Sequence, residues 1–335
     1  MAPLFDRFVG TGGIGSGIIF LMDDNRPLSR HETRLAELSD ARDYCKQHII
    51  LHYVSRVLSP QSSVHAVGAV GRDAAGRELL AMMRGAGIDT AFVRESDLPT
   101  MYAVCLQYPD SAICNVTTAQ SASSTVTPGD VAAALAALGE RVGQTTCVVA
   151  APEVPVPARL ALLKGAGERG ARRAASCLLD EAEAFRAGGG VENTDWLFLN
   201  QDEAAAFVTE PPQEPERLAR ACHEALRGRN PGIGLAVTFG SRGSWVCQGD
   251  RARHVPAVAV KAAATGGAGD AFLAGTLCGM ALGLPFMAET GPLAAHLGSR
   301  LAAESVTSLD TIAPHIGREL AMAALGELLE KGGAA

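Results

Sequence analysis

The chain has 335 residues, of which 47% are hydrophobic and 5% are aromatic, and its formal net charge is −7. This length suits one or two α/β domains with a large buried core. The negative charge and the lack of a basic run predict no nucleic-acid partner. No segment approaches the roughly 18 uninterrupted apolar residues of a membrane span, so no membrane partner is expected.

The cellular compartment is suggested by two features. The eight cysteines occur singly, so the sequence holds no C-x-x-C pair for zinc or for thiol redox chemistry. The N-terminal stretch MAPLFDRFVG contains Asp6 and Arg7 and has no long apolar segment, so we expect no signal peptide. Reduced thiols buried in a cytoplasmic protein fit both features.

A glycine-rich stretch near the start reads VGTGGIGSG. Gly10, Gly12 and Gly15 have the G-x-G-x-x-G spacing of a dinucleotide-binding turn, which opens a helix and has an acidic residue about 20 positions later. Here the glycines lead into the strand-like run IIFLM, and Asp23 follows too early. A glycine-rich strand or bulge is therefore the better interpretation, and a dinucleotide oxidoreductase is the weaker alternative.

The next segments depart from a simple repeating pattern. Residues 23–48 form a charged insertion that we expect to be a loop followed by a helix. Strand-like sequences at about 12–24 and 98–120 are expected to form a small antiparallel lid at one edge of a sheet, with a turn at 109–111.

Apolar runs of strand length alternate with helical patterns along much of the chain. Residues 63–71 are predicted to be a buried strand and residues 73–87 a helix. TTCVVAAP, DWLFLN and GLAVTFG are further predicted strands, and Thr127 and Asp130 mark a helix start. The alternation predicts an α/β fold with a mainly parallel sheet covered on both faces.

The stretch VKAAATGGAGDAFLAGTLCGMALG at 260–283 carries the clearest chemistry. Gly266, Gly267 and Gly269 allow backbone amides to point into one concavity at a helix N-terminus, which is an anion site. Asp270 at its mouth could accept a proton from a hydroxyl while the amides stabilise a transferring phosphoryl group. The alternative is that Asp270 only caps the helix.

These residues resemble the ribokinase-like (PfkB) carbohydrate kinase family, whose C-terminal signature is D-T-x-G-A-G-D-x-F. Three further stretches resemble family motifs, in the family's order and over about residues 60–310: VGAVGRDAAGRELLAMMRGAGIDT, the N-x-x-E element in LNQDEAAAF, and the T-x-G-x-x-G element in VTFGSRGSWV. The matching residues are Gly71, Asp73, Gly76, Asn200, Glu203, Thr238, Gly240, Gly243, Thr265, Gly267, Ala268, Gly269, Asp270 and Phe272.

The resemblance implies a single ribokinase-like domain over residues 1–335, a three-layer α/β/α sandwich with a small β lid. It implies an ATP-dependent phosphotransferase that acts on a hydroxyl of a sugar, polyol or nucleoside-like small molecule. Pairing of two copies through the lid, as in family members, would make a homodimer.

The resemblance also implies roles for the matched residues. Asp270 would be the general base, and the backbone at Gly267, Ala268 and Gly269 would form the anion hole. Asn200 and Glu203 would organise Mg²⁺ and its waters, with Glu203 as the metal-binding residue. The implied nucleotide-lining residues are Thr238, Gly240 and Gly243.

The acceptor side departs from the family pattern. Ala264 replaces the first Asp of the signature, and Gly13 and Gly15 occupy the substrate-binding positions where the family usually carries Asn and Asp. The family's sugar-binding Gly-Gly stretch is replaced by DYCKQHII, at 43–50. We therefore expect ribose and common hexoses to be poor substrates.

Replacement groups for the acceptor site can come from the insertion. Asp43, Lys46 and His48 are the candidates, and each could instead be an ordinary surface residue. The remaining alternative to an active kinase is a catalytically weak ligand-binding or regulatory protein that retains the kinase fold.

Overall fold

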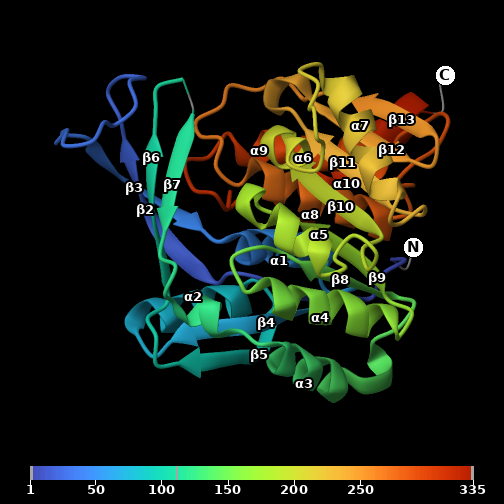
Figure 1. The fold of residues 1–335 in the computed structure, drawn as a ribbon, viewed down its shortest axis with the longest axis horizontal. Coiled ribbons are helices and arrows are strands. Elements are labelled where there is room, and N and C mark those ends of the chain that lie inside the picture. The colour runs from blue at the N-terminus through green and yellow to red at the C-terminus, as the bar shows by residue number, and fades with distance from the viewer. Residues whose placement is uncertain (1–2, 111, 333–335) are drawn as a thin grey trace.

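A nine-stranded sheet forms the centre of the computed structural model, which describes residues 3–110 and 112–332 (Figure 1). Its strands are β1 (Arg7–Thr11), β4 (Ser63–Gly71), β5 (Ile88–Ser96), β8 (Thr146–Ala150), β9 (Arg172–Ser176), β10 (Trp196–Asn200), β11 (Gly234–Thr238), β12 (Ser244–Gln248) and β13 (Arg251–Val255). Their order is β13-β12-β11-β10-β9-β8-β1-β4-β5. All neighbours from β11 to β5 are parallel, and β12 and β13 add an antiparallel edge.

Helices cover both faces of this sheet (Figure 1). One face carries α1 (Lys46–Leu58), α2 (Ala74–Gly85), α8 (Ala268–Ala281), α9 (Ala294–Ser305) and α10 (Arg318–Gly332). The other carries α3 (Pro128–Leu138), α4 (Val156–Gly167), α5 (Ala182–Ala187), α6 (Gln201–Ala205) and α7 (Pro215–Arg227). Each face of the sheet packs against its helices in a separate hydrophobic core. Successive residues of β1 point to opposite faces, so Phe8 packs in the first core and Val9 in the second. The three-layer α/β/α prediction is confirmed.

The predicted strands of the central sheet and the helix start at Thr127 lie where the sequence patterns put them. The run at 63–71 is β4, and Thr127 caps α3 in a reciprocal pair of hydrogen bonds with Asp130. All eight cysteines are free, and Cys114 is exposed while the other seven are buried. Over residues 3–110 and 112–332, no helix is long and apolar enough to cross a membrane.

A second sheet of four strands forms a lid at the edge where the parallel strands end (Figure 1). Its order is β3 (Glu37–Tyr44), β2 (Gly15–Leu21), β6 (Met101–Gln107) and β7 (Ile113–Thr117). The prediction of a purely antiparallel lid was wrong, because β2 and β6 are parallel. Between them the chain passes through the main sheet and returns in the same direction, as a parallel pair requires. Ser111, in the predicted turn at 109–111, lies outside the described residues.

The charged insertion at 23–48 also differs from the expected loop and helix. Its residues 37–44 form β3, which pairs with β2 as an edge strand of the lid. The strand sequence ELSDARDY is mostly polar because much of it faces solvent, so it lacks the apolar alternation of a core strand. Helix α1 begins at Lys46.

The N-terminal glycines lie in a strand-loop-strand segment. Gly10 is in β1 and Gly15 begins β2, with no helix between these two positions. A Cβ at Gly10 would lie 2.9 Å from the Leu51 side chain of α1, so this glycine permits close packing of helix on sheet. The dinucleotide alternative lacks the helix that it requires.

Candidate active site

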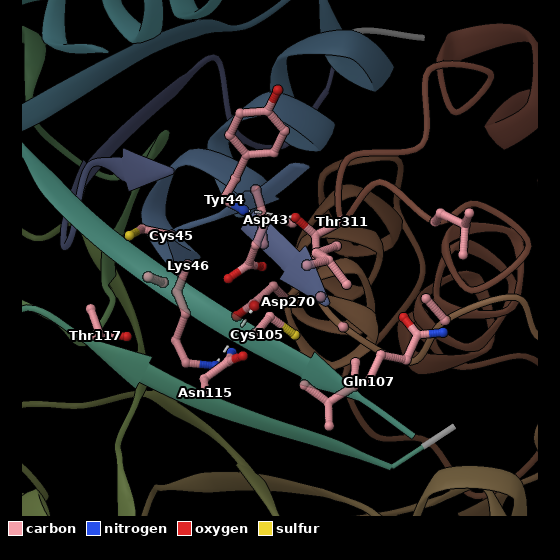
Figure 2. A pocket seen from close by; sticks show the side chains of 18 of the residues that line it. Asp43, Tyr44, Cys45, Lys46, Cys105, Gln107, Asn115, Thr117, Asp270 and Thr311 are labelled. Carbon is pink, nitrogen blue, oxygen red and sulfur yellow. Dashed lines mark hydrogen bonds and ion pairs between the residues drawn. The ribbon is translucent and has the colours of Figure 1, made fainter. Parts of the chain in front are cut away.

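A pocket lies between the lid and the carboxyl ends of the central strands (Figure 2). Its walls come from the junction of β3 with α1, from the inward faces of β6 and β7, and from the glycine turn before α8. The polar lining residues are Asp43, Lys46, Gln107, Asn115, Thr117, Glu153, Asp270 and Thr311. Ligands of parallel α/β sheets bind at this edge, so the position is that of a binding site.

Asp270 lies in the first turn of α8 and is only 7% exposed. The helix starts after Gly267, whose φ of +75° and close approach to Thr311 exclude a side chain. The Ala271 amide donates to the Gly267 carbonyl at 2.8 Å, so the amides of Gly269 and Asp270 precede the first helical bond. The turn therefore places backbone donors and a carboxylate at one helix N-terminus.

Lys46 begins α1 and supplies the ionic partner of Asp270. Its Nζ lies 3.7 Å from Oδ2 of Asp270. Burial raises the pKa of Asp270, and Lys46 opposes that shift. The pKa of Lys46 is raised mainly by Asp270 and further by Glu153 and Glu203. One ammonium group is thus surrounded by several carboxylates.

Glu153 follows β8 and is held in a backbone conformation with φ of +73°. Such a value is uncommon for a residue other than glycine and is typical of functional sites. Its Oε2 accepts a hydrogen bond from the Lys46 amide at 3.0 Å. Burial raises the pKa of Glu153 to about 7, against the lowering effect of Lys46.

The two glycines expected at the acceptor side make room for other groups. A Cβ at Gly13 would lie 2.5 Å from both Cβ and Oε2 of Glu153, and one at Gly15 would lie 2.5 Å from the Met101 carbonyl oxygen. Neither glycine is among the residues that line the pocket. The Glu153 side chain occupies the space that a side chain at position 13 would need.

The three candidates from the insertion lie in different environments. Asp43 and Lys46 line the pocket, and Figure 2 shows the Asp43 carboxylate directed toward Asp270. Burial raises the pKa of Asp43 to about 6, with a further contribution from Asp270. His48 is fully buried beside Tyr44 and lacks a hydrogen-bond partner at both ring nitrogens. Burial lowers the pKa of His48 to about 3, so it is a neutral core residue away from the pocket.

The predicted nucleotide residues lie on two neighbouring strands. Asn200 and Thr238, the last residues of β10 and β11, are register partners. Asn200 Oδ1 accepts from the Glu203 amide at 2.9 Å, and Glu203 Oε2 accepts from the Asn200 amide at 2.8 Å. This reciprocal cap at the start of α6 fixes both side chains. Burial raises the pKa of Glu203, and Lys46 opposes the shift.

A tight turn follows β11. Gly240 and Gly243 have φ of +58° and +83°, and residues 240–242 form a single 3₁₀ turn. A Cβ at Gly243 would lie 2.3 Å from the Val255 carbonyl oxygen, so this position requires glycine. The turn, Asn200 and Thr238 lie at the same edge of the sheet as Asp270, on strands that do not line the pocket.

Several lining residues did not emerge from the sequence analysis. Glu153 follows a predicted parallel strand, which is a signal that could have identified it. Gln107, Asn115 and Thr117 occupy alternate positions of β6 and β7, with the period of two that marks one face of a strand. Thr311 lies in a loop after α9, and no pattern in the sequence marks it.

The pfkB family carbohydrate kinase model matches residues 50–316. The chain belongs to this family. It is therefore a carbohydrate kinase, a phosphotransferase. No curated protein sequence matches the chain significantly.

Solved structures of ribokinases and a nucleoside kinase share the fold. Ribokinase from Giardia lamblia is 22% identical over 96% of this chain and 98% of that one, with a TM-score of 0.81. Arabidopsis thaliana ribokinase, complexed with ribose and ATP, is 20% identical over 97% and 99%, with a TM-score of 0.73. A Burkholderia thailandensis nucleoside kinase, in complex with inosine, is 15% identical over 96% and 99%, with a TM-score of 0.74.

Proposed function

We propose that this chain, acting as one kinase domain, transfers the γ-phosphoryl group of ATP to a hydroxyl of a sugar, polyol or nucleoside-like acceptor. The observation that carries the proposal is the buried Asp270 carboxylate beside the glycine turn of α8, in a pocket covered by the lid. Ribose, inosine and ATP in the related solved structures support this class of acceptor and donor.

Asp270 acts as the general base in this proposal. It accepts the proton of the acceptor hydroxyl as that oxygen attacks phosphorus and the bond to the β-γ bridging oxygen breaks. Backbone amides at Gly267, Ala268 and Gly269, together with the positive end of α8, stabilise charge on the transferring group. The Ala268 amide donates to the Thr265 carbonyl through a long hydrogen bond of 3.4 Å.

ATP is proposed to lie along Asn200, Thr238 and the Gly240–Gly243 turn. Mg²⁺ is proposed to lie beside Glu203, a half-buried carboxylate that is held in place by the cap through Oε2 and whose pKa is raised by desolvation. Among the described residues, no three His, Cys, Asp or Glu side chains form a complete metal site. A cation held by one carboxylate, waters and phosphates suits magnesium, which would offset phosphate charge.

The assembly is proposed to be a homodimer through the outer face of the lid. Tyr102 and Val116 project from β6 and β7 on that face and are 41% and 70% exposed, and Leu38 of β3 is 57% exposed. Exposed apolar residues clustered on one sheet face indicate a contact surface. The free cysteines fit the proposed cytoplasmic location, where ATP is available.

The proposal is tested by mixing the protein with Mg-ATP and a panel of sugars, polyols and nucleosides and measuring ADP release and the phosphorylated product. We expect product with at least one acceptor and thermal stabilisation by Mg-ATP. Stabilisation without product from any acceptor would instead favour a ligand-binding protein that keeps the kinase fold.

A further inference from the structure

The charges that line the pocket are unbalanced. Asp43, Glu153 and Asp270 contribute three carboxylates, and Lys46 is the one cationic residue among the described residues that line it. Asp270 has Lys46 at 3.7 Å, and Lys46 lies beside the glycine turn where the phosphoryl group is proposed to bind. Lys46 also lowers the pKa values of Asp43 and Glu153, so the three carboxylates share one ammonium group.

The two remaining carboxylates are poorly solvated. Asp43 is 9% exposed, and Glu153 lies against Gly13 with one oxygen on the Lys46 amide. Burying carboxylates without a cation costs folding free energy. Such groups are therefore expected where a ligand binds to them. The left-handed backbone at Glu153 adds to this cost, so the position of its carboxylate is maintained against local strain.

The pocket also contains a buried acceptor atom that lacks a hydrogen bond. Gln107 is 8% exposed and donates from Nε2 to the Ala263 carbonyl at 2.8 Å, while its Oε1 is buried without a hydrogen bond. Carboxylates and an amide oxygen accept hydrogen bonds only. The pocket also holds neutral side-chain donors on Asn115, Thr117 and Thr311, but among its described lining residues only Lys46 carries a positive charge.

We infer that the acceptor of this kinase carries a protonated amine, held by Asp43 and Glu153, in addition to the hydroxyl that is phosphorylated. The inference rests on the proposed function and narrows its acceptor class to amino sugars and amino polyols. An ammonium group supplies the missing positive charge and three hydrogen-bond donors. A neutral sugar supplies hydroxyl donors but adds no positive charge beside the two carboxylates.

Matched acceptors test the inference. One set compares D-glucosamine with D-glucose and N-acetyl-D-glucosamine, and a second set compares serinol with glycerol. Within each set the compounds differ at one amine. Their affinities are measured calorimetrically in the presence of a non-hydrolysable ATP analogue and Mg²⁺. We expect at least one amine to bind about 10–100-fold more tightly than its neutral counterparts, as for hydrogen bonds to charged groups. Turnover of the same compounds should follow the same order.

Substitution identifies the groups responsible. Asp43→Asn and Glu153→Gln should each reduce the amine preference about tenfold or more while leaving affinity for the ATP analogue unchanged. Glu224→Gln, an exposed position on α7 whose side chain is 80% accessible, is the matched control and should keep the preference.

Other outcomes overturn the inference in distinguishable ways. Neutral acceptors that bind and react as well as their amines would exclude it and leave the kinase proposal intact. Mg²⁺ or Mn²⁺ alone stabilising the wild type but not Asp43→Asn would make these carboxylates a metal site. Failure of every acceptor and of Mg-ATP to bind would contradict the proposed function itself.

Discussion

The Lys46 ammonium group lies 3.7 Å from Oδ2 of Asp270. Lys46 begins helix α1, and Asp270 lies in the first turn of helix α8, more than 200 positions further along the chain. The pair connects the segment proposed to bind the acceptor with the glycine turn proposed to bind the phosphoryl group. Substitution of Lys46 therefore tests the proposed acceptor side of the site, and substitution of Asp270 tests the proposed phosphoryl-transfer side.

Asp270→Asn should reduce kcat by about 10²–10⁴-fold, because the amide cannot accept the acceptor's proton. Mg-ATP affinity should be retained. The melting temperature should change little, because the N-cap of α8 is Gly267 and Asp270 lies two residues inside the helix. The assay uses an acceptor from the panel above. Normal turnover in Asp270→Asn, with a stability loss confined to Asp270→Ala, would support the capping role instead.

Lys46→Met should lower kcat/KM and move the acidic limb of its pH profile upward. Without the lysine, nothing opposes the effect of burial on Asp270, so its pKa rises and the base is lost at a higher pH. Lys46→Arg should restore the position of the limb in part. Lys164→Met, at an exposed position of α4, is the control. An acidic limb at the same pH as in the wild type would refute this relation.

Glu153→Gln should alter how stability depends on pH. The pKa of Glu153 is raised from 4.5 to about 7, so the folded state binds a proton that the unfolded chain releases. This group's contribution is present below about pH 4.5 and is lost as pH rises through about 7. Relative to the wild type, the variant should gain about 1–3 kcal/mol in unfolding free energy between pH 4.5 and 8. Urea unfolding of both proteins measures the difference, and parallel curves would disprove it.

Gly13→Ala should impair acceptor binding more than nucleotide binding. Its new methyl group would lie 2.5 Å from two atoms of Glu153, so that side chain must move away from the Lys46 amide. We expect the acceptor KM to rise at least tenfold with little change in Mg-ATP affinity. Gly326→Ala, on an open face of α10, is the matched control and should slightly raise the melting temperature. Equal effects of the two variants would contradict the conclusion that Gly13 leaves room for the Glu153 carboxylate.

Val116→Lys should dissociate the proposed dimer. The substitution puts a charge on the outer face of the lid, where Val116 is 70% exposed in a single chain. Light scattering should give the mass of two chains for the wild type and of one chain for the variant. A monomeric wild type would remove the proposal of pairing through this face.

The sequence predicted the central fold well because its parallel strands are buried on both sides and appear as continuous apolar runs, as in β4 and β8. The sequence did not predict β3. This strand lies at an edge of the lid, most of its residues are polar, and Asp43 is the one buried residue in it. The proposed phosphoryl-binding end could be located in the sequence because its glycines and Asp270 form one contiguous motif. The proposed acceptor end was predicted only in part: Asp43 was a candidate, but Glu153 and Gln107 join it through tertiary structure alone.

The alternation along β6 and β7 limits how this enzyme can diversify. Ala103, Cys105 and Gln107 face the pocket, whereas Tyr102 and Val104 point the other way. Deleting one residue within such a strand would exchange its two faces, bringing bulky side chains into the pocket and exposing the ligand-facing ones. New acceptor preferences can therefore arise by point substitution at every second position. Changes in length are expected to be confined to the loops that join the lid strands.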